Sequence, residues 1–309
     1  MIFLNNNTIK QLSTQAKYYP KGKFPREKRI YGVWREYVVN MGVTIGVYDS
    51  GIGGLTTLSL LRARLTGCSF FYLADNARMP FGSKSKEEVY AAVANARKIL
   101  NANCDITVFG CNTASVSTEP QEAFTLRPEL SLYDPSETLV LGTPLTLGGL
   151  KAQEKGFHVA DTRELAVLTE IRASLAFKNK TRYDAEPLRE YLERSLLPYK
   201  GIKNVLLGCS HYIYNAELIK SITNCSFTDD GNGRTVDRVC SFLHSNQSDC
   251  NFCSCGNKCG KCVQKDNFEL SKVRFSFTGA NETAKYQWLL DKLQSGYAAH
   301  YYSEQNAAP

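Results

Sequence analysis

Short strand-like runs alternate with helix-like segments in the first half of this chain. Residues 44–48, 69–74 and 105–110 are apolar and β-rich, whereas residues 55–65 and 89–100 repeat their apolar side chains at helical spacing. Strands that alternate with helices form parallel sheets covered by helices. The pattern therefore predicts an α/β fold built on a mainly parallel sheet.

A second series of the same kind begins near residue 138. Residues 138–141 and 203–207 are predicted to be strands, and Asp229-Asp230-Gly231 marks the end of one more. Residues 163–177 and 186–197 are predicted to be helices, and the chain returns to strand alternation at 273–277 and to a helix at 283–293.

The long helix before residue 100 carries its own start signal. Ser85 is followed three residues later by Glu88, which is the spacing of a capping box. We therefore expect this helix to begin at Ser85.

Two predicted strands end in the same dipeptide. Gly110-Cys111 and Gly208-Cys209 each follow an apolar run and precede two hydrogen-bonding residues. This echo predicts two related halves that face a common cleft at the carboxyl ends of their strands. A junction between strand and helix can also lower a thiol pKa. The alternative for each cysteine is a small buried hydrophobic residue.

Two thiols on opposite sides of a cleft suit inversion of a stereocentre. One thiolate removes the Cα proton, and the thiol opposite delivers a proton to the other face. Asp49 and His211 lie close in sequence to such strand ends and could assist, although each could instead be structural. Hydroxyl, amide and backbone N–H groups could hold the substrate carboxylate; these are Ser50, Asn112, Thr113, Ser210 and the glycine-rich loop.

Four motifs occur in the order seen in glutamate racemases. They are Gly-Val-Tyr-Asp-Ser-Gly-Ile-Gly-Gly-Leu at 46–55, Asp-Asn-Ala-Arg-Met-Pro-Phe-Gly at 75–82, Cys-Asn-Thr-Ala-Ser at 111–115 and Gly-Cys-Ser-His-Tyr at 208–212. The chain resembles that family from about residue 43 to 125, from 138 to 240, and again around Phe275–Gly279.

The resemblance implies two α/β domains related by a pseudo-twofold axis, with the active site between them. It implies Cys111 and Cys209 as the proton-transfer pair, assisted by Asp49 and His211, with Cys111 serving the D-enantiomer and Cys209 the L-enantiomer. A family glutamate maps loosely onto Glu170. The residues that would hold the substrate are Ser50, Pro80, Phe81, Gly82, Asn112, Thr113, Thr143, Thr146 and Ser210. It implies no PLP, metal or nucleotide cofactor.

The chain departs from the family pattern in places. Phe81 stands where the family usually has tyrosine, and Ser210 stands where it has threonine. Only about 30 residues separate Cys111 from Gly142, a span in which the family has room for an extra strand and helix. We therefore expect a missing strand–helix unit within residues 116–139.

The predicted domains follow from these segments. A first α/β domain takes residues 41–127 and 268–293, a second takes 128–240, a cysteine-rich insertion takes 241–267, and 294–309 is a frayed tail. Residues 1–40 form a basic extension with eight Lys or Arg and two Glu, in a chain of net charge +7. It is a solvated extension, a transit peptide, an arm for nucleic acid or lipid, or the product of an upstream start before Met41.

Six of the eleven cysteines lie between Cys240 and Cys262. Their CxxC pairs indicate a structural metal site of Cys250, Cys253, Cys259 and Cys262, a reduced loop, or local disulfides. This cluster lies outside the resemblance.

The favoured function is racemisation of glutamate without a cofactor, supplying D-glutamate for peptidoglycan. The alternatives are a racemase of aspartate or another small acid, and a protein of this fold that binds a ligand without turnover. The partner expected is a small amino acid, with neither nucleic acid nor membrane, and a homodimer is compatible with the sequence. No apolar run is long enough for a membrane span, and no secretory signal precedes the fold, so we expect a cytoplasmic protein.

Overall fold

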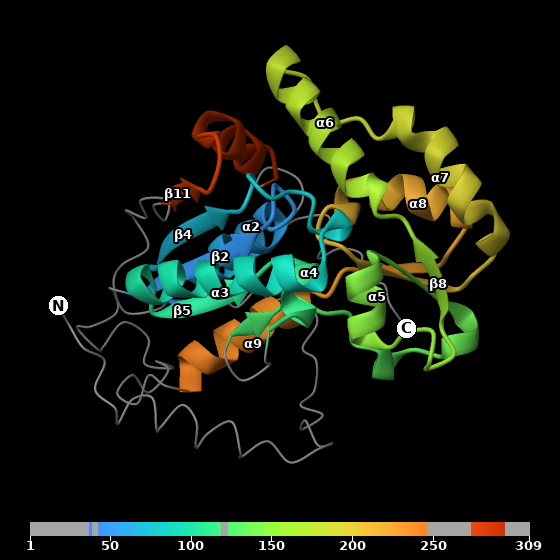
Figure 1. The fold of residues 1–309 in the computed structure, drawn as a ribbon, viewed down its shortest axis with the longest axis horizontal. Helices are drawn as coiled ribbons and strands as arrows, with labels where there is room; N and C mark the ends of the chain where they lie inside the picture. The colour runs from blue at the N-terminus through green and yellow to red at the C-terminus, as the bar shows by residue number, and fades with distance from the viewer. Residues whose placement is uncertain (1–36, 39–42, 119–122, 246–272, 294–309) are drawn as a thin grey trace, which may run out of the picture.

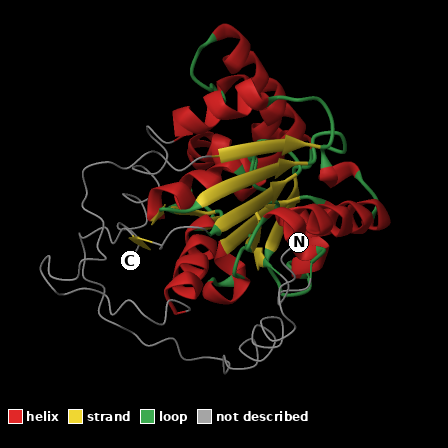
Figure 2. Cartoon of the chain, turned by 90° about the vertical axis from the view of Figure 1, so that its left-hand side faces the viewer, coloured by secondary structure: helices red, strands yellow, loops and turns green. Residues whose placement is uncertain are grey.

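A computed structural model describes residues 37–38, 43–118, 123–245 and 273–293 (Figure 1). The described chain forms two parallel sheets, each covered by helices, as the α/β prediction requires. In Figure 1 the blue and teal elements of the first sheet lie on one side and the green and yellow elements of the second sheet on the other. Figure 2 shows helices flanking the strands on both sides.

The first sheet has the strand order β11-β4-β2-β5-β6, and every neighbouring pair is parallel. Its strands are β2 (Thr44–Asp49), β4 (Ser69–Ala74), β5 (Ile106–Phe109), β6 (Phe124–Thr125) and β11 (Val273–Phe277). A separate parallel pair joins β1 (Tyr37–Val38) to β3 (Leu65–Thr66).

Side chains of the first sheet are buried on both faces. In β4, Phe70 and Tyr72 pack into one hydrophobic cluster, whereas Phe71 and Leu73 pack into another. Helices α2 (Leu55–Arg64) and α9 (Asn232–Ser245) and the helix at 283–293 contribute to the first cluster. Helices α3 (Lys86–Asn103) and α4 (Asn112–Val116) contribute to the second. Two-sided burial explains why these strands are continuous apolar runs.

The capping box predicted at the start of α3 is confirmed. The Ser85 hydroxyl accepts the Glu88 amide at 3.2 Å, and the Glu88 carboxylate accepts the Ser85 amide at 2.8 Å. The helix places Val89, Val93 and Ala96 against the sheet.

The second sheet has the order β10-β9-β7-β8 and is also wholly parallel. Its strands are β7 (Thr138–Gly142), β8 (His158–Asp161), β9 (Asn204–Gly208) and β10 (Phe227–Asp229). On one face Leu139 and Val205 join helices α6 (Glu164–Asn179), α7 (Arg189–Leu196) and α8 (Ala216–Thr223). On the other face Val140 and Leu206 pack beside α5 (Pro144–Leu150).

Short 3-10 turns complete the described elements. They are η2 (Phe81–Ser83), η3 (Leu130–Leu132), η4 (Pro135–Glu137), η5 (Glu186–Leu188), η6 (Leu197–Tyr199) and η7 (Tyr212–Asn215). The single helix predicted over 186–197 is divided into η5, α7 and the start of η6. Pro198 explains why α7 ends at Leu196, since a proline lacks the N–H group that continues an α-helix. Pro187 stands in the first turn, where a proline is tolerated.

The strand expected to be missing from residues 116–139 is present in a short form. The two-residue β6 pairs with β5, and η3 and η4 follow it in place of a helix. The ring of Phe124 packs against Phe242 of α9 with centroids 5.5 Å apart, so a long-range contact holds this short strand.

Several predictions fall on residues outside the described part. They concern the extension at 1–36 and 39–42, the insertion from 246 onward with its four predicted metal-binding cysteines, and the tail 294–309. The domain boundaries stay a prediction; α9, whose sequence overlaps the end of the predicted second domain, packs against α2 of the first sheet. Within the described ranges, no helix has the length and apolar character to cross a membrane.

Candidate active site

Four strand ends from the two sheets meet at one place. From the first sheet, β2 ends at Asp49 and β5 leads into Cys111; from the second, β7 leads into Thr143 and β9 into Cys209. All four side chains are buried. The carboxyl ends of parallel strands are where ligands bind in open α/β sheets.

Cys111 is almost inaccessible, at 4% exposure, and its Sγ lies 3.9 Å from Ser50 Oγ. Burial raises the pKa of this thiol above its ordinary value, and the nearby Asp49 carboxylate raises it further. The Ala114 N–H acts in the opposite direction but does not prevail. The lowered pKa expected from the strand–helix junction is therefore wrong for Cys111, because α4 supplies too little stabilisation to offset burial.

Cys209 belongs to a hydrogen-bonded chain of side chains. Its Sγ lies 3.9 Å from His211 Nδ1, and His211 Nε2 lies 3.0 Å from Glu170 Oε1. Burial lowers the pKa of His211, but its bonds to Cys209 and Glu170 raise it more, so the net shift is well upward. His211 therefore favours the imidazolium form beside the sulfur.

Asp49 connects the first sheet, where it ends β2, to the loop after β9 of the second sheet. Its Oδ1 accepts the Gly51 amide at 2.6 Å and its Oδ2 accepts the Ser210 hydroxyl at 2.8 Å. Burial raises the pKa of Asp49, although His211 and these two hydrogen bonds act to lower it.

Glu170, in α6, also receives groups from both halves. Its Oε1 accepts the Ile52 amide at 2.7 Å, and its Oε2 lies 3.7 Å from the ammonium of Lys285. Burial would raise the pKa of Glu170, but His211, Lys285 and the Ile52 amide lower it overall. Glu170, which the family pattern matched only loosely, thus lies directly beside His211.

Three hydroxyls form a closed ring between α4 and α5. Thr113 Oγ1 lies 3.1 Å from Thr143 Oγ1 and 3.2 Å from Thr146 Oγ1, and the last two lie 3.1 Å apart. All three side chains are buried. The ring thus joins a first-sheet helix to a second-sheet helix at the site.

The glycine-rich loop is shaped by the side chains that pack on it. A Cβ added to Gly51 would lie 2.1 Å from Glu170 Oε1, and one added to Gly53 would lie 2.3 Å from Ser210 Oγ. Only glycine leaves room for Glu170 and His211 to lie directly against this backbone.

The remaining predicted residues lie around the same place. A Cβ on Gly82 would meet Thr143 Cγ2 at 2.7 Å, while Phe81 is buried with its ring 6.3 Å from that of Tyr48. Pro80 precedes η2 and accepts the Ser83 hydroxyl. Asn112 donates to the Leu126 carbonyl at 3.2 Å, and its Oδ1 is buried without a hydrogen-bond partner in the described structure.

Sequence reasoning missed two groups near the site. Lys285 reaches Glu170 from the helix at 283–293, and the Tyr214 hydroxyl donates to the Ile52 carbonyl at 3.2 Å. Neither residue stands in a motif at a strand end, so no local signal marks them. A lysine in the first turns of an amphipathic helix is normally solvent-exposed, and its burial appears only in the folded chain.

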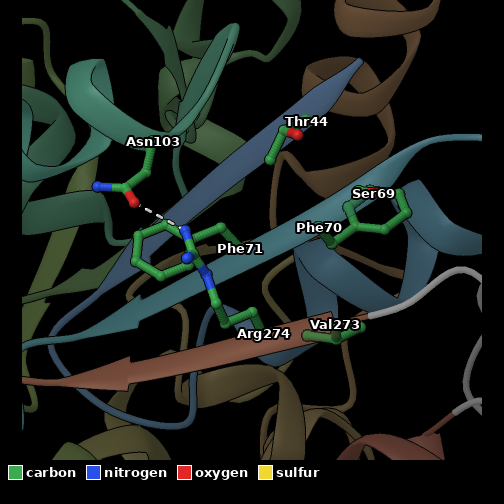
Figure 3. A pocket seen from close by; sticks show the side chains of 7 residues that line it. All are labelled: Thr44, Ser69, Phe70, Phe71, Asn103, Val273 and Arg274. Carbon is green, nitrogen blue, oxygen red and sulfur yellow. Dashed lines mark hydrogen bonds between the residues drawn. The ribbon is translucent and has the colours of Figure 1, made fainter. Parts of the chain in front are cut away.

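One pocket lies elsewhere, at the amino-terminal ends of β2, β4 and β11 (Figure 3). It measures about 360 Å³, and Arg274 there donates to Asn103 at 2.8 Å and stacks on Phe71. None of the predicted site residues lines it. Across the described residues, no cluster of three or more His, Cys, Asp and Glu side chains is arranged to hold a metal ion.

Comparison with known proteins agrees with this geometry. No family model matches the chain. The glutamate racemase of Campylobacter concisus is 32% identical over 219 residues, which cover 64% of this chain and 82% of that protein. The chain belongs to the glutamate racemase family. A second member, from Halothermothrix orenii, is 30% identical over 216 residues, covering 62% of this chain and 81% of that protein.

Solved structures of glutamate racemases share the fold. The isoform RacE1 of Bacillus anthracis superposes with a TM-score of 0.62 at 23% identity, covering 83% of this chain and 95% of that one. The Francisella tularensis glutamate racemase, solved with D-glutamate, gives 0.58 at 21% identity, covering 82% and 94%. The predicted family and α/β fold are thus confirmed, and the chain is an isomerase of the racemase type.

Proposed function

We propose that this protein interconverts L- and D-glutamate by proton transfer between two cysteines, without a cofactor. The observation that carries the proposal is the convergence of Cys111 and Cys209, from the two sheets, on one buried site lined by hydrogen-bonding groups. Glutamate is favoured over aspartate because the relatives are glutamate racemases and one neighbour was solved with D-glutamate.

In the direction from L to D, Cys209 is the base. Its proton passes to His211, whose raised pKa suits it to hold that proton. The thiolate then removes the Cα proton of L-glutamate. Glu170 orients His211 through Nε2, which leaves Nδ1 facing the sulfur.

Cys111 is the acid for the same direction. Burial keeps its thiol protonated, and a protonated thiol is what must deliver a proton to the opposite face of Cα. In the reverse direction the roles exchange, and the Asp49 carboxylate, whose charge acts on Cys111, assists there.

The lining groups divide between the charges of an amino acid. The hydroxyls of Thr113, Thr143, Thr146 and Ser50 donate to the substrate carboxylates, on which negative charge builds as the Cα proton leaves. Ser210 instead donates its hydroxyl proton to Asp49 and lines the site beside it. The unpartnered Oδ1 of Asn112 accepts from the substrate ammonium. A buried acceptor without a partner is costly, which supports a ligand as its partner.

Two further parts of the proposal concern the cell. D-glutamate made here would supply peptidoglycan synthesis in the cytoplasm. The enzyme needs neither PLP nor a metal for this chemistry, because each thiol transfers one proton. A homodimer is an additional proposal, to be measured by sedimentation of the purified protein.

The test is incubation of the purified protein with L- or D-glutamate in D₂O, without added cofactor. We expect loss of optical activity together with deuterium at Cα, followed by circular dichroism and NMR. Deuterium exchange at Cα of aspartate but not of glutamate would show that the substrate is aspartate. A folded protein that binds glutamate without exchange would contradict it.

Substitution of either thiol separates the two half-reactions. Cys111→Ser and Cys209→Ser should each lower racemisation by roughly 10³-fold or more, since each removes a proton-transfer group. Cys209→Ser should retain deuterium exchange into D-glutamate, and Cys111→Ser into L-glutamate. Cys225→Ser is the control and should stay active, because this buried cysteine precedes the start of β10, whereas the site lies at strand ends.

A further inference from the structure

Lys285 is a buried lysine that the racemase mechanism leaves without a role. Its residue is only 8% exposed, and it belongs to the helix at 283–293, which packs with the first sheet. Its ammonium lies 2.6 Å from Glu282 of its own segment and 3.7 Å from Glu170 of α6. A lysine is seldom buried unless it is paired.

An ion pair between Glu170 and Lys285 adds one more residue to the chain of contacts that begins at Cys209. From the sulfur, the chain runs through His211 Nδ1 and Nε2 to Glu170 Oε1, and from Glu170 Oε2 to Lys285. The two carboxylate oxygens thus have different partners. Oε1 contacts His211, which follows β9 of the second sheet, and Oε2 lies near Lys285, whose helix packs with the first sheet.

We propose that Lys285 is a positioning residue for proton transfer at Cys209, acting through Glu170 and His211. The inference rests on the proposed function of Cys209 as a base. Lys285 touches neither thiol in the described contacts. It keeps Glu170 ionised and fixed in place, so that Glu170 in turn holds His211 with Nδ1 toward the sulfur.

Other titratable groups surround this carboxylate, and among those described only His211 can also carry a positive charge. The groups with which Glu170 interacts electrostatically are His211, Lys285, Asp49, Tyr72, Tyr214 and Tyr286. His211 and Lys285 are the two cations among them. Lys285 itself faces Glu282, Glu170 and the ring of Tyr286. Loss of Lys285 therefore leaves Glu170 with one cation, and the pKa of Glu170 rises.

The experiment measures kcat/KM against pH for wild type, Lys285→Met, Lys285→Gln and Lys285→Arg. The two neutral variants should move the acidic limb upward by about one pH unit, which lowers kcat/KM about tenfold on that limb. KM should change little, because Lys285 acts through Glu170 and His211. Lys285→Arg keeps the charge and should restore most of the activity. Lys292→Met, an exposed lysine of the same helix, is the matched control.

A second readout does not need turnover. The ¹³C resonance of the Glu170 carboxyl, assigned by its loss in Glu170→Gln, should titrate at higher pH in Lys285→Met than in wild type. Circular dichroism checks that each variant is folded, and Lys285→Gln replaces Lys285→Met if the latter is not.

The outcomes separate this inference from the proposed function. A wild type that shows no exchange at Cα defeats the proposed function, and the inference falls with it as a statement about catalysis. An active wild type whose pH profile and Glu170 titration are unchanged in both neutral variants overturns the role of Lys285 alone. A shift in both readouts, reversed in Lys285→Arg, supports it.

Discussion

At the scale of single residues, the site depends on the ion pair between Glu170 and His211, which come from different elements around the second sheet. Glu170 comes from α6 and His211 from the turn after β9, and their side chains meet at 3.0 Å. Both are buried, so each charge requires the other. From the first-sheet side, the backbone amide of Ile52 donates to Glu170, and the ammonium of Lys285 adds a positive charge 3.7 Å from the carboxylate.

The pair should make stability depend on pH in a defined way. The pKa of Glu170 is lowered on folding, so its contribution is present above the unfolded value of about 4.3 and is lost as pH falls through the folded value. The pKa of His211 is raised, so its contribution is complete below about 6.5 and is lost as pH rises through the folded value. Both contributions are present together between those two unfolded values.

Glu170→Gln should therefore lower the free energy of unfolding most within that window, by about 3 kcal/mol. The difference from wild type should shrink toward more acidic and more alkaline pH. Urea unfolding of both proteins between pH 3 and 9 measures it. A difference that stays constant over this range would show that the ion pair makes no pH-dependent contribution.

At the scale of elements, the loop between β2 and α2 is the element on which the site is assembled. The backbone of Gly51 lies against Glu170 and His211, and that of Gly53 lies against Ser210. Any side chain at these positions must displace a group of the proposed proton-transfer machinery.

Gly51→Ala should abolish racemisation, because its Cβ would overlap Glu170 Oε1 at 2.1 Å. The cost in stability should be about 1–3 kcal/mol, as for other overpacked sites. Steady-state rates and urea unfolding measure the two effects. Gly148→Ala, in α5 with no atom within 4 Å of the added Cβ, is the matched control. It should remain active and gain about 0.5–1 kcal/mol. An active Gly51→Ala enzyme would contradict this prediction, because it would show that the loop shifts enough to accommodate the added Cβ.

The sequence predicted elements well where one local pattern was sufficient. β2, β4, β7 and β9 are apolar runs buried on both faces, and each lies within a residue or two of its predicted range. β8 was missed because its side chains are only partly buried, so it lacks that run. At the site, residues after strand ends were found from motifs, whereas Lys285 and Tyr214 arrive from distant elements. Their positions follow from packing and have no local signature.

At the scale of the whole molecule, both thiols are enclosed by the meeting of the two halves. Cys111 is 4% and Cys209 is 7% exposed, so little of either residue is open to solvent. Contacts that join the halves include the threonine ring, the bond from Ser210 to Asp49 and the bond from Tyr214 to Ile52. We infer that a substrate enters only after some of these contacts open.

Tyr214→Phe should make opening easier, because it removes one hydrogen bond worth about 1 kcal/mol between the halves. Alkylation of Cys209 by iodoacetamide should then accelerate about fivefold, as measured by peptide mass spectrometry. Tyr183→Phe removes a bond within the second half, from Tyr183 to Asn215, and is the control. Equal labelling rates in the two variants would mean that the bond from Tyr214 does not restrain access.

The ring of Thr113, Thr143 and Thr146 has a further consequence. Three hydroxyls carry three protons and form three contacts of 3.1–3.2 Å, so each can donate once and accept once around a closed circuit. All three hydroxyls are therefore satisfied within the ring. We infer that rotation about the three C–O bonds would turn the same protons toward a substrate carboxylate. On this view the three hydroxyls stay paired with one another until a substrate carboxylate replaces those contacts.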